Sequence, residues 1–217
     1  MSTRPVKPRR RYDSPRRREQ AEATRAAILE AAQRLFERDG YATTTMAAIA
    51  AEAGVALKTV YLAFETKAGL LRALWHLRLR GDGGDVPMPE RPWFRDTLAD
   101  PDPRSRLDRM ARQSRAVKDR AGALMGVIRD AAAVDADAAD LWGRIEAEFH
   151  GLLEPLAATF AAEGSLRSGL DAARATDLLW MLNHPDLWRL LVAGRGWSPD
   201  EYESWLAGAF RRELLGE

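Results

Sequence analysis

The sequence contains no cysteine, which excludes disulfide bonds, thiolate zinc sites, iron–sulfur clusters and thiol nucleophiles. It also lacks any apolar run near the roughly 20 residues that cross a bilayer. The arginine-rich N-terminal segment has no apolar stretch of the kind that a secretory signal needs. With 46% hydrophobic residues and a net charge of only +1, the chain has the composition of a globular protein. We therefore expect a cytoplasmic protein that does not bind membranes.

Signatures of catalysis are equally scarce. The three histidines, His76, His150 and His184, lack the spacing of a metal-binding pair on one helix. No serine occupies a Gly-x-Ser-x-Gly setting. The glycines at 81–84 precede prolines instead of following a strand, which argues against a phosphate-binding loop. We expect a protein that is not an enzyme and that uses no cofactor and no metal.

The near-zero net charge conceals an uneven distribution. Residues 1–18 hold eight Lys or Arg and one Asp, and residues 1–80 together carry a charge of +8, which leaves −7 for residues 81–217. A basic first third followed by an acidic remainder indicates one end that binds a polyanion and a second part with another task. A solvated arginine-rich tail without function is the alternative.

Helical patterns dominate the sequence, and no segment shows the period-two alternation of a strand. Gly40 and Gly54 are expected to end helices, and Pro155 to kink or split one, because its ring removes a hydrogen bond. A bend is expected at His184-Pro185. The prediction is an all-α fold of about nine helices, over residues 15–38, 46–53, 57–64, 67–79, 102–119, 122–134, 136–162, 171–193 and 198–215.

The segment from Met46 to Leu62 has the pattern of a helix-turn-helix. Ile49-Ala50 supplies the apolar and small pair of the first helix, and Gly54 follows Ala50 by four residues, where a side chain would obstruct the turn. Val60 and Ala63 are expected to point inward from the second helix. Together with the basic segment upstream, the pattern favours DNA as the partner.

Residues 28–74 resemble the TetR family of bacterial transcriptional regulators. Like residues stand at Ala31-Ala32, Leu35-Phe36, Gly40-Tyr41, Ile49-Ala50, Ala53-Gly54-Val55, Tyr61, Phe64 and Lys67. The resemblance implies a homodimer whose larger helical domain binds a small-molecule effector and thereby alters the affinity for double-stranded DNA. The expected organisation is a disordered basic arm (1–18), a helix-turn-helix DNA-binding domain of three helices (19–80), a Gly/Pro-rich linker (81–92) and a larger helical domain for ligand binding and dimerisation (93–217).

The second helix of the motif supplies candidate DNA contacts. Lys58, Thr59 and Tyr61 lie near its N-terminal half, which faces DNA in this docking mode. Thr45 is a candidate phosphate contact, and Lys67 resembles the phosphate-binding lysine of the family. The alternative makes Tyr61 a core aromatic and leaves the two lysines solvated.

The chain departs from the family pattern where polar residues are common. Ala56 and Leu57 stand at such positions, as does Ala63 in place of a frequent histidine. Ala56 and Leu57 either contact thymine methyl groups or weaken direct readout. More of the affinity is then expected from the arm, including Arg16, Arg17 and Arg18, which either enters a minor groove or follows phosphates.

All seven tryptophans follow position 74, which is consistent with an apolar ligand cavity in the second domain. The candidate ligand-binding residues are Trp142, Phe149, His150, Trp180, Asn183 and His184. The alternative for each aromatic is an ordinary place in the core, and for each histidine a structural role.

The last two helices carry more apolar residues than one buried face needs, which favours a two-fold interface there. The candidate dimerisation residues are Leu187, Leu191, Tyr202, Trp205 and Phe210. Two other functions stay open: a DNA-coating protein of the nucleoid type, with weak sequence preference, and a regulator whose second domain binds a protein partner.

Overall fold

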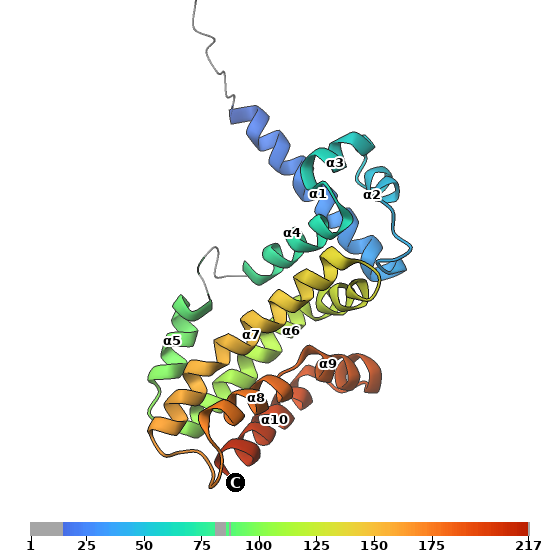
Figure 1. Ribbon diagram of the computed structural model, residues 1–217. Coiled ribbons are helices and arrows are strands. Elements are labelled where there is room, and N and C mark those ends of the chain that lie inside the picture. Colours follow the sequence, from blue (N-terminus) through green and yellow to red (C-terminus); the bar gives the residue numbers. More distant parts are fainter. Residues whose placement is uncertain (1–14, 81–85, 87, 217) are drawn as a thin grey trace, which may run out of the picture.

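A computed structural model describes residues 15–80, 86 and 88–216. These residues form helices joined by turns, so the all-α prediction is confirmed, with an N-terminal helix-turn-helix unit and a larger helical domain (Figure 1). Residues 1–14 of the expected arm, and positions 81–85 and 87 of the expected linker, lie outside the described residues. The elements are α1 (Pro15–Asp39), α2 (Met46–Glu52), α3 (Leu57–Phe64), α4 (Lys67–Arg80), η1 (Met88–Glu90), α5 (Pro92–Ala99), α6 (Pro103–Ala132), α7 (Ala136–Ala162), α8 (Ala172–Leu182), α9 (Pro185–Trp188), η2 (Arg189–Ala193), α10 (Pro199–Phe210) and η3 (Arg211–Leu215).

Helix α1 spans Pro15–Asp39, which confirms the helix predicted over residues 15–38. Arg16, Arg17 and Arg18 are therefore helical, and the domain division that placed them in a disordered arm was wrong. The physical reason is that these arginines form the first turn of a helix whose later residues Ile28 and Phe36 are buried in the core, and this burial stabilises the helix. At its other end Gly40 has φ of 85°, as expected for the residue that ends a helix.

Helix α6 is one continuous helix, whereas the sequence suggested two separated near residue 120. Gly122 does not break it because the residue serves packing: a Cβ there would lie 3.1 Å from the indole nitrogen of Trp188. The weak helix propensity of glycine, about 1 kcal/mol, is offset by this close contact. Helix α7 likewise runs through Pro155 without a break, since buried Leu153 and Leu156 hold both sides of the proline in the core.

The helix is interrupted at Asn183-His184, directly before Pro185, where a bend was predicted: α8 ends at Leu182 and the short α9 begins at Pro185. The last long helix, α10, opens with a capping box, in which Ser198 and Glu201 satisfy each other's backbone N–H groups. Both features arise from local sequence chemistry.

The long α6 and α7 lie side by side and connect the two ends of the molecule (Figure 1). Their adjoining ends, including Leu124, Ile128 and Leu141, belong to the same buried cluster as α1 to α4. Their other halves form a second cluster with α8 and α10. The helix-turn-helix unit is therefore packed directly on the scaffold that carries the larger domain. Among the described residues no single helix is long and apolar enough to span a membrane, and only α2 with α3, bent by 111°, pass such a test as a pair.

Candidate functional site

The second helix of the motif, α3, divides into a buried and an exposed face. Val60 is fully buried and Phe64 nearly so, which fixes the helix on the core. Tyr61 is 48% exposed and Leu62 is 77% exposed, and Lys58 also faces solvent. The exposure of Tyr61 contradicts the alternative that it is a core aromatic. Three of the candidate DNA contacts on α3, Leu57, Lys58 and Tyr61, are thus exposed, while Thr59 is half-buried.

The turn before α3 has the geometry that the motif requires. Gly54 has φ of 66°, in the left-handed region that favours glycine, and Val55 N donates to Ala50 O at 3.0 Å. Thr45 caps α2, its hydroxyl oxygen accepting from Ala48 N at 3.0 Å. Ala56 precedes α3 and offers no side-chain cap, so the first N–H groups of α3 have no side-chain acceptor there.

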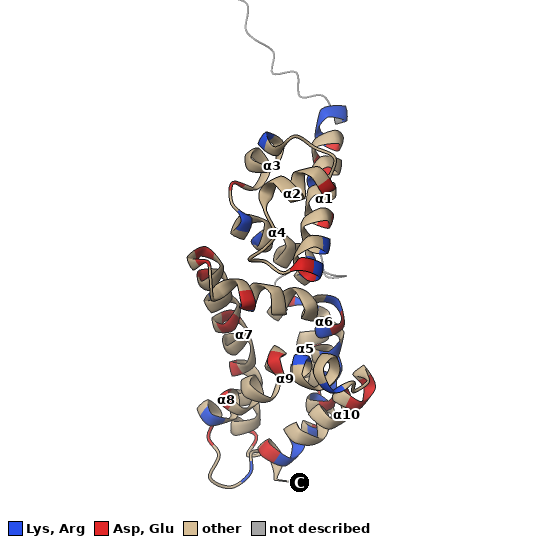
Figure 2. Ribbon diagram, turned by 90° about the vertical axis from the view of Figure 1, so that its right-hand side faces the viewer, with Lys and Arg blue, Asp and Glu red and all other residues tan. Residues whose placement is uncertain are grey.

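The first turns of α1 extend past the rest of the unit. Residues 16–23 are all exposed, and Arg16 to Arg18 lie at this tip. Figure 2 shows the tip of α1 and helix α3 at the same end of the molecule, with basic residues on both. A single polyanion could therefore contact both elements.

Lys67 has a structural task that the sequence did not reveal. Its ammonium group donates to the carbonyl oxygens of Tyr41 at 2.7 Å and Thr44 at 2.9 Å, and lies 4.1 Å from the centre of the Tyr41 ring. Partial burial lowers the pKa of Lys67. The side chain braces the loop before α2, and its contact with phosphate stays a prediction.

The end of α3 is held by a tight junction with α1 and α4. The Arg25 guanidinium donates to Ala63 O at 2.9 Å and lies 4.2 Å from the centre of the Phe64 ring. Glu65 has φ of 60°, and Thr66 N donates to Phe64 O at 2.6 Å across it. Such a γ-turn with positive φ is uncommon because it strains an L-residue. The direction of α3 is thereby fixed relative to α4.

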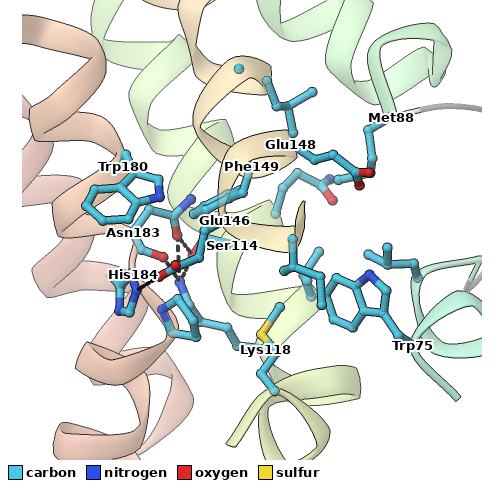
Figure 3. A pocket seen from close by; sticks show the side chains of 18 of the residues that line it. Trp75, Met88, Ser114, Lys118, Glu146, Glu148, Phe149, Trp180, Asn183 and His184 are labelled. Atoms are coloured by element: carbon cyan, nitrogen blue, oxygen red, sulfur yellow. Dashed lines mark hydrogen bonds and ion pairs between the residues drawn. The ribbon is translucent and has the colours of Figure 1, made fainter. Parts of the chain in front are cut away.

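The larger domain contains a cavity of about 600 Å³, within the range of small-molecule sites (Figure 3). Five of the six candidate ligand-binding residues line it: Trp142, Phe149, Trp180, Asn183 and His184. The sixth, His150, is not among the lining residues, and its contact with a ligand stays a prediction. Its Nε2 lies 3.1 Å from Asp177 Oδ1, and its ring lies 6.2 Å from that of Trp180, which does line the cavity.

Polar groups at the inner end of the cavity centre on Lys118 of α6. Its Nζ donates to Ser114 Oγ at 2.6 Å, to Asn183 Oδ1 at 2.6 Å and to Asn183 O at 2.9 Å. The Ser114 hydroxyl in turn donates to Asn183 Oδ1. Burial lowers the pKa of Lys118 to about 7, because no charged partner offsets the loss of water.

His184 lies between two tryptophans of the cavity wall. Its ring is 5.2 Å from that of Trp180 and 6.2 Å from that of Trp142, each edge to face. Nδ1 accepts from the backbone N–H of Asp186, which leaves the proton on Nε2 to be donated to Glu146 Oε1 at 3.3 Å. The histidine is thus fixed in one tautomer and orientation.

The sequence reasoning missed several lining residues, among them Trp75, Arg91, Trp93, Ser114 and Lys118. For Lys118 a signal existed. Leu107, Met110, Ala111, Ser114, Lys118 and Ala121 follow one helical face of α6, and all are buried. A lysine in the middle of an otherwise small and apolar stripe is the pattern of a buried cation.

Two candidate dimerisation residues are placed inside the protomer. Tyr202 and Phe210 are fully buried in the second core cluster, so the prediction that they form an intersubunit surface was wrong. Both side chains contribute to the core of the larger domain. Leu187, Leu191 and Trp205 are half-buried, and neighbouring Leu190 is 56% exposed, which leaves apolar surface on this side of the domain.

Residues 28–74 match the family described as bacterial regulatory proteins, tetR family. The transcriptional regulator TtgR of Pseudomonas putida is 49% identical over 59 residues, which are 27% of this chain and 28% of TtgR. The regulator AcrR of Shigella flexneri is 37% identical over 60 residues, which are 28% of each protein. The matches to TtgR and AcrR span little more than a quarter of the length of those relatives.

Solved structures extend the likeness to nearly the whole chain. Native NalD, described as the secondary repressor of the MexAB-OprM multidrug efflux pump in Pseudomonas aeruginosa, has a TM-score of 0.68 and 26% identity, and the match covers 90% of this chain and 98% of NalD. A SmeT–triclosan complex has a TM-score of 0.65 at 20% identity, over 89% of this chain and 92% of SmeT. The latter shows a common fold.

Proposed function

We propose that this chain, whose residues 28–74 are a TetR-family DNA-binding unit, is a ligand-responsive transcriptional repressor that binds a palindromic operator as a homodimer. The observation that carries the proposal is helix α3, which exposes Lys58 and Tyr61 to solvent. Helix α4, which follows the helix-turn-helix, lines the cavity. NalD and SmeT support it, since the former is described as a repressor and the latter was solved with a small molecule.

In the docked complex α3 enters the major groove, and Lys58 contacts a guanine edge or a phosphate. Tyr61, Thr59 and Thr45 contribute hydroxyl groups. The arginines at the tip of α1 neutralise phosphates beside the same groove, so the affinity falls steeply as the salt concentration rises.

Helix α4 connects the two sites. It begins at Lys67, which braces the loop before α2, and its later residues Trp75, His76 and Leu79 line the cavity. A ligand that prefers one position of α4 therefore changes the spacing of the two α3 helices in a dimer, because only differential affinity shifts such an equilibrium.

The dimer uses the apolar surface left on the C-terminal helices, at Leu187, Leu190, Leu191 and Trp205. A two-fold axis there places two α3 helices about one DNA turn apart, roughly 34–36 Å, or a multiple of it. The cavity favours a small-molecule ligand over a protein partner for the second domain, because binding a protein does not require a large internal cavity.

The test is selection of bound fragments from genomic DNA by the purified full chain at near-physiological salt. We expect enrichment of one inverted repeat. Binding without enrichment would favour a DNA-coating protein, because non-specific binding rests on phosphates alone. Absence of binding in the ligand-free protein would contradict the repressor mechanism.

A further inference from the structure

Lys118 is a buried cation for which the described residues provide only uncharged acceptors. It is 4% exposed, lines the cavity and donates to a hydroxyl, an amide oxygen and a backbone carbonyl. The ring of Tyr202 lies 5.2 Å from its ammonium group, and the phenol of that ring has no hydrogen-bond partner among the described residues. Neutral oxygens offset only part of the cost of removing an ammonium group from water.

The carboxylates around the cavity are engaged elsewhere. Glu146 of α7 accepts from His184, and Asp186 of α9 pairs with Arg129 at 2.6 Å. Glu148 is exposed and lies beside Met88, away from Lys118 (Figure 3). None of the three is within ion-pair distance of Lys118.

A second cavity-lining cation repeats the pattern. Arg91 is 6% exposed, and its guanidinium donates to the carbonyl oxygens of Leu79 at 2.8 Å and Val86 at 3.2 Å. Both buried cations of the cavity wall are therefore held by neutral groups, which leaves the interior attractive to an anion.

Two residues of the same cavity lining, Trp180 and Asn183, carry further hydrogen-bond donors. The buried indole N–H of Trp180 has no acceptor among the described residues. The side-chain oxygen of Asn183 accepts from Lys118 and Ser114, so its amide N–H groups can donate to a ligand. The lining therefore offers an acidic ligand hydrogen-bond donors besides Lys118.

We propose that the cavity binds an amphipathic organic acid, with an aromatic or aliphatic body against Trp142, Phe149 and Trp180 and a carboxylate or phenolate against Lys118. The inference rests on the proposed ligand-responsive function. The acid oxygen replaces the neutral Asn183 oxygen as an acceptor of Lys118, so the attraction between opposite charges is added to the hydrogen bond. Trp180 and the Asn183 amide donate to the remaining lone pairs of the ligand.

The proposal has a consequence for protons. The free protein holds Lys118 partly neutral near pH 7, since burial lowers its pKa to about 7. An anionic ligand favours the charged form, so binding takes up about one proton near pH 8 and almost none near pH 5.5. Calorimetry in buffers of different ionisation enthalpy counts these protons.

The experiment uses three naphthalene probes that carry, at the same ring position, a carboxylate, a carboxamide or an aminomethyl group. Quenching of tryptophan fluorescence reports binding, because four tryptophans line the cavity. In the wild-type protein we expect the carboxylate to bind at least about tenfold more tightly than the carboxamide, and the amine to bind most weakly. Equal affinities, a preference for the amine, or no binding of any probe at about 1 mM would overturn the proposal.

Two variants separate a ligand contact from a structural role. Lys118→Met should abolish the preference for the carboxylate and the proton uptake while the carboxamide still binds. Arg112→Met is the matched control, since Arg112 is an exposed cation of the same helix and does not line the cavity. If Lys118→Met does not fold, the comparison of the three probes and the proton count on wild-type protein still decide the question.

Operator binding without probe, measured in parallel, separates the two proposals. A protein that binds an inverted repeat but does not distinguish the three probes contradicts only the organic-acid inference. A protein that prefers the carboxylate but binds no operator contradicts the proposed regulator.

Discussion

The phenol of Tyr41, in the turn after α1, donates a 2.5 Å hydrogen bond to Oδ2 of Asp135, the residue that caps α7. The Lys67 ammonium lies over the same ring, 4.1 Å from its centre. The loop that leads into the helix-turn-helix is thus tied both to α4 and to the scaffold of the larger domain. This contact is a polar link between the helix-turn-helix unit and the domain that holds the cavity.

Replacing Tyr41 by Phe should lower the free energy of unfolding by about 1–2 kcal/mol, because a partly buried hydrogen bond to a charged group is lost. Urea denaturation at neutral pH measures this. Tyr202→Phe is the matched control: its buried hydroxyl has no hydrogen-bond partner among the described residues, so its removal should cost little. Equal losses in the two variants would contradict the assignment.

The advantage of wild type over Tyr41→Phe should also depend on pH. The hydrogen bond from Tyr41 lowers the pKa of Asp135. A carboxyl group with a lowered folded pKa contributes stability above its unfolded pKa, about 3.9, and loses it as the pH falls through the folded pKa. Denaturation series at pH 7 and below about 4 should therefore show the gap between the two proteins narrowing at acid pH.

Gly69, in the first turn of α4, is required by the end of α3. A Cβ at this position would lie 2.2 Å from Phe64 O, a backbone atom that cannot rotate away. Gly69→Ala should destabilise the protein by about 1–3 kcal/mol and weaken operator binding, since the junction that orients α3 must shift. Thermal melting and operator titration measure the two effects.

Gly143→Ala provides the control for that substitution. A Cβ at Gly143 of α7 would meet nothing within 4 Å, so alanine should stabilise the helix by about 0.5–1 kcal/mol. Two variants of the same chemical change, in two helices, should thus move the melting temperature in opposite directions. A rise of the melting temperature in both would show that the junction at Gly69 yields to a methyl group and does not fix α3.

The sequence predicted those parts of the structure that depend on neighbouring residues. The turn at Gly54 and the starts of α2 and α10, at Met46 and Pro199, agree with the predictions because each depends on side chains within a few positions. The failures arose from contacts across the fold. Gly122 suggested a break because its partner Trp188, 66 positions later, is not visible in the local pattern.

The candidate sites show the same division. The exposed face of α3 follows from helical periodicity, whereas the depth at which a side chain is buried does not. Tyr202 and Phe210 have the composition of an interface and fill a core instead. Lys118 escaped notice because lysine is rarely buried, and its partner Asn183 lies 65 positions away.

Lys58→Ala and Tyr61→Ala should each weaken operator binding by about 1–3 kcal/mol, the value of one good contact. Both side chains are exposed, so the free energy of unfolding should not change. If Lys58 contacts a phosphate, its removal also lowers the slope of log affinity against log salt by about one, whereas a base contact changes the preferred sequence. Arg112→Ala serves as the control and should leave operator affinity unchanged. Unchanged operator affinity in both α3 variants would refute the proposal that the exposed face of α3 contacts DNA.

Lys118 should give the stability of the protein a distinctive dependence on alkaline pH. Its folded pKa is about 7, far below the value of about 10.4 for a lysine in an unfolded chain. Between these values the unfolded chain binds more protons at this residue than the folded protein does. The free energy of unfolding therefore rises with pH there, by up to about 1.4 kcal/mol per unit from this group alone.

Lys118→Met removes that contribution, so the difference in free energy of unfolding between variant and wild type should change steadily from pH 7 to 9. Relative to wild type the variant should be most stable at or below about pH 7, where the buried ammonium is charged, and should lose ground as the pH rises. Urea denaturation across this range measures the difference, with Arg112→Met as a control that should run parallel to wild type, because a guanidinium stays charged throughout. If the free energy of unfolding of Lys118→Met changes with pH in parallel with that of wild type, Lys118 has an ordinary pKa and its charge is already stabilised inside the protein. That result would contradict the argument that the cavity needs an acidic ligand.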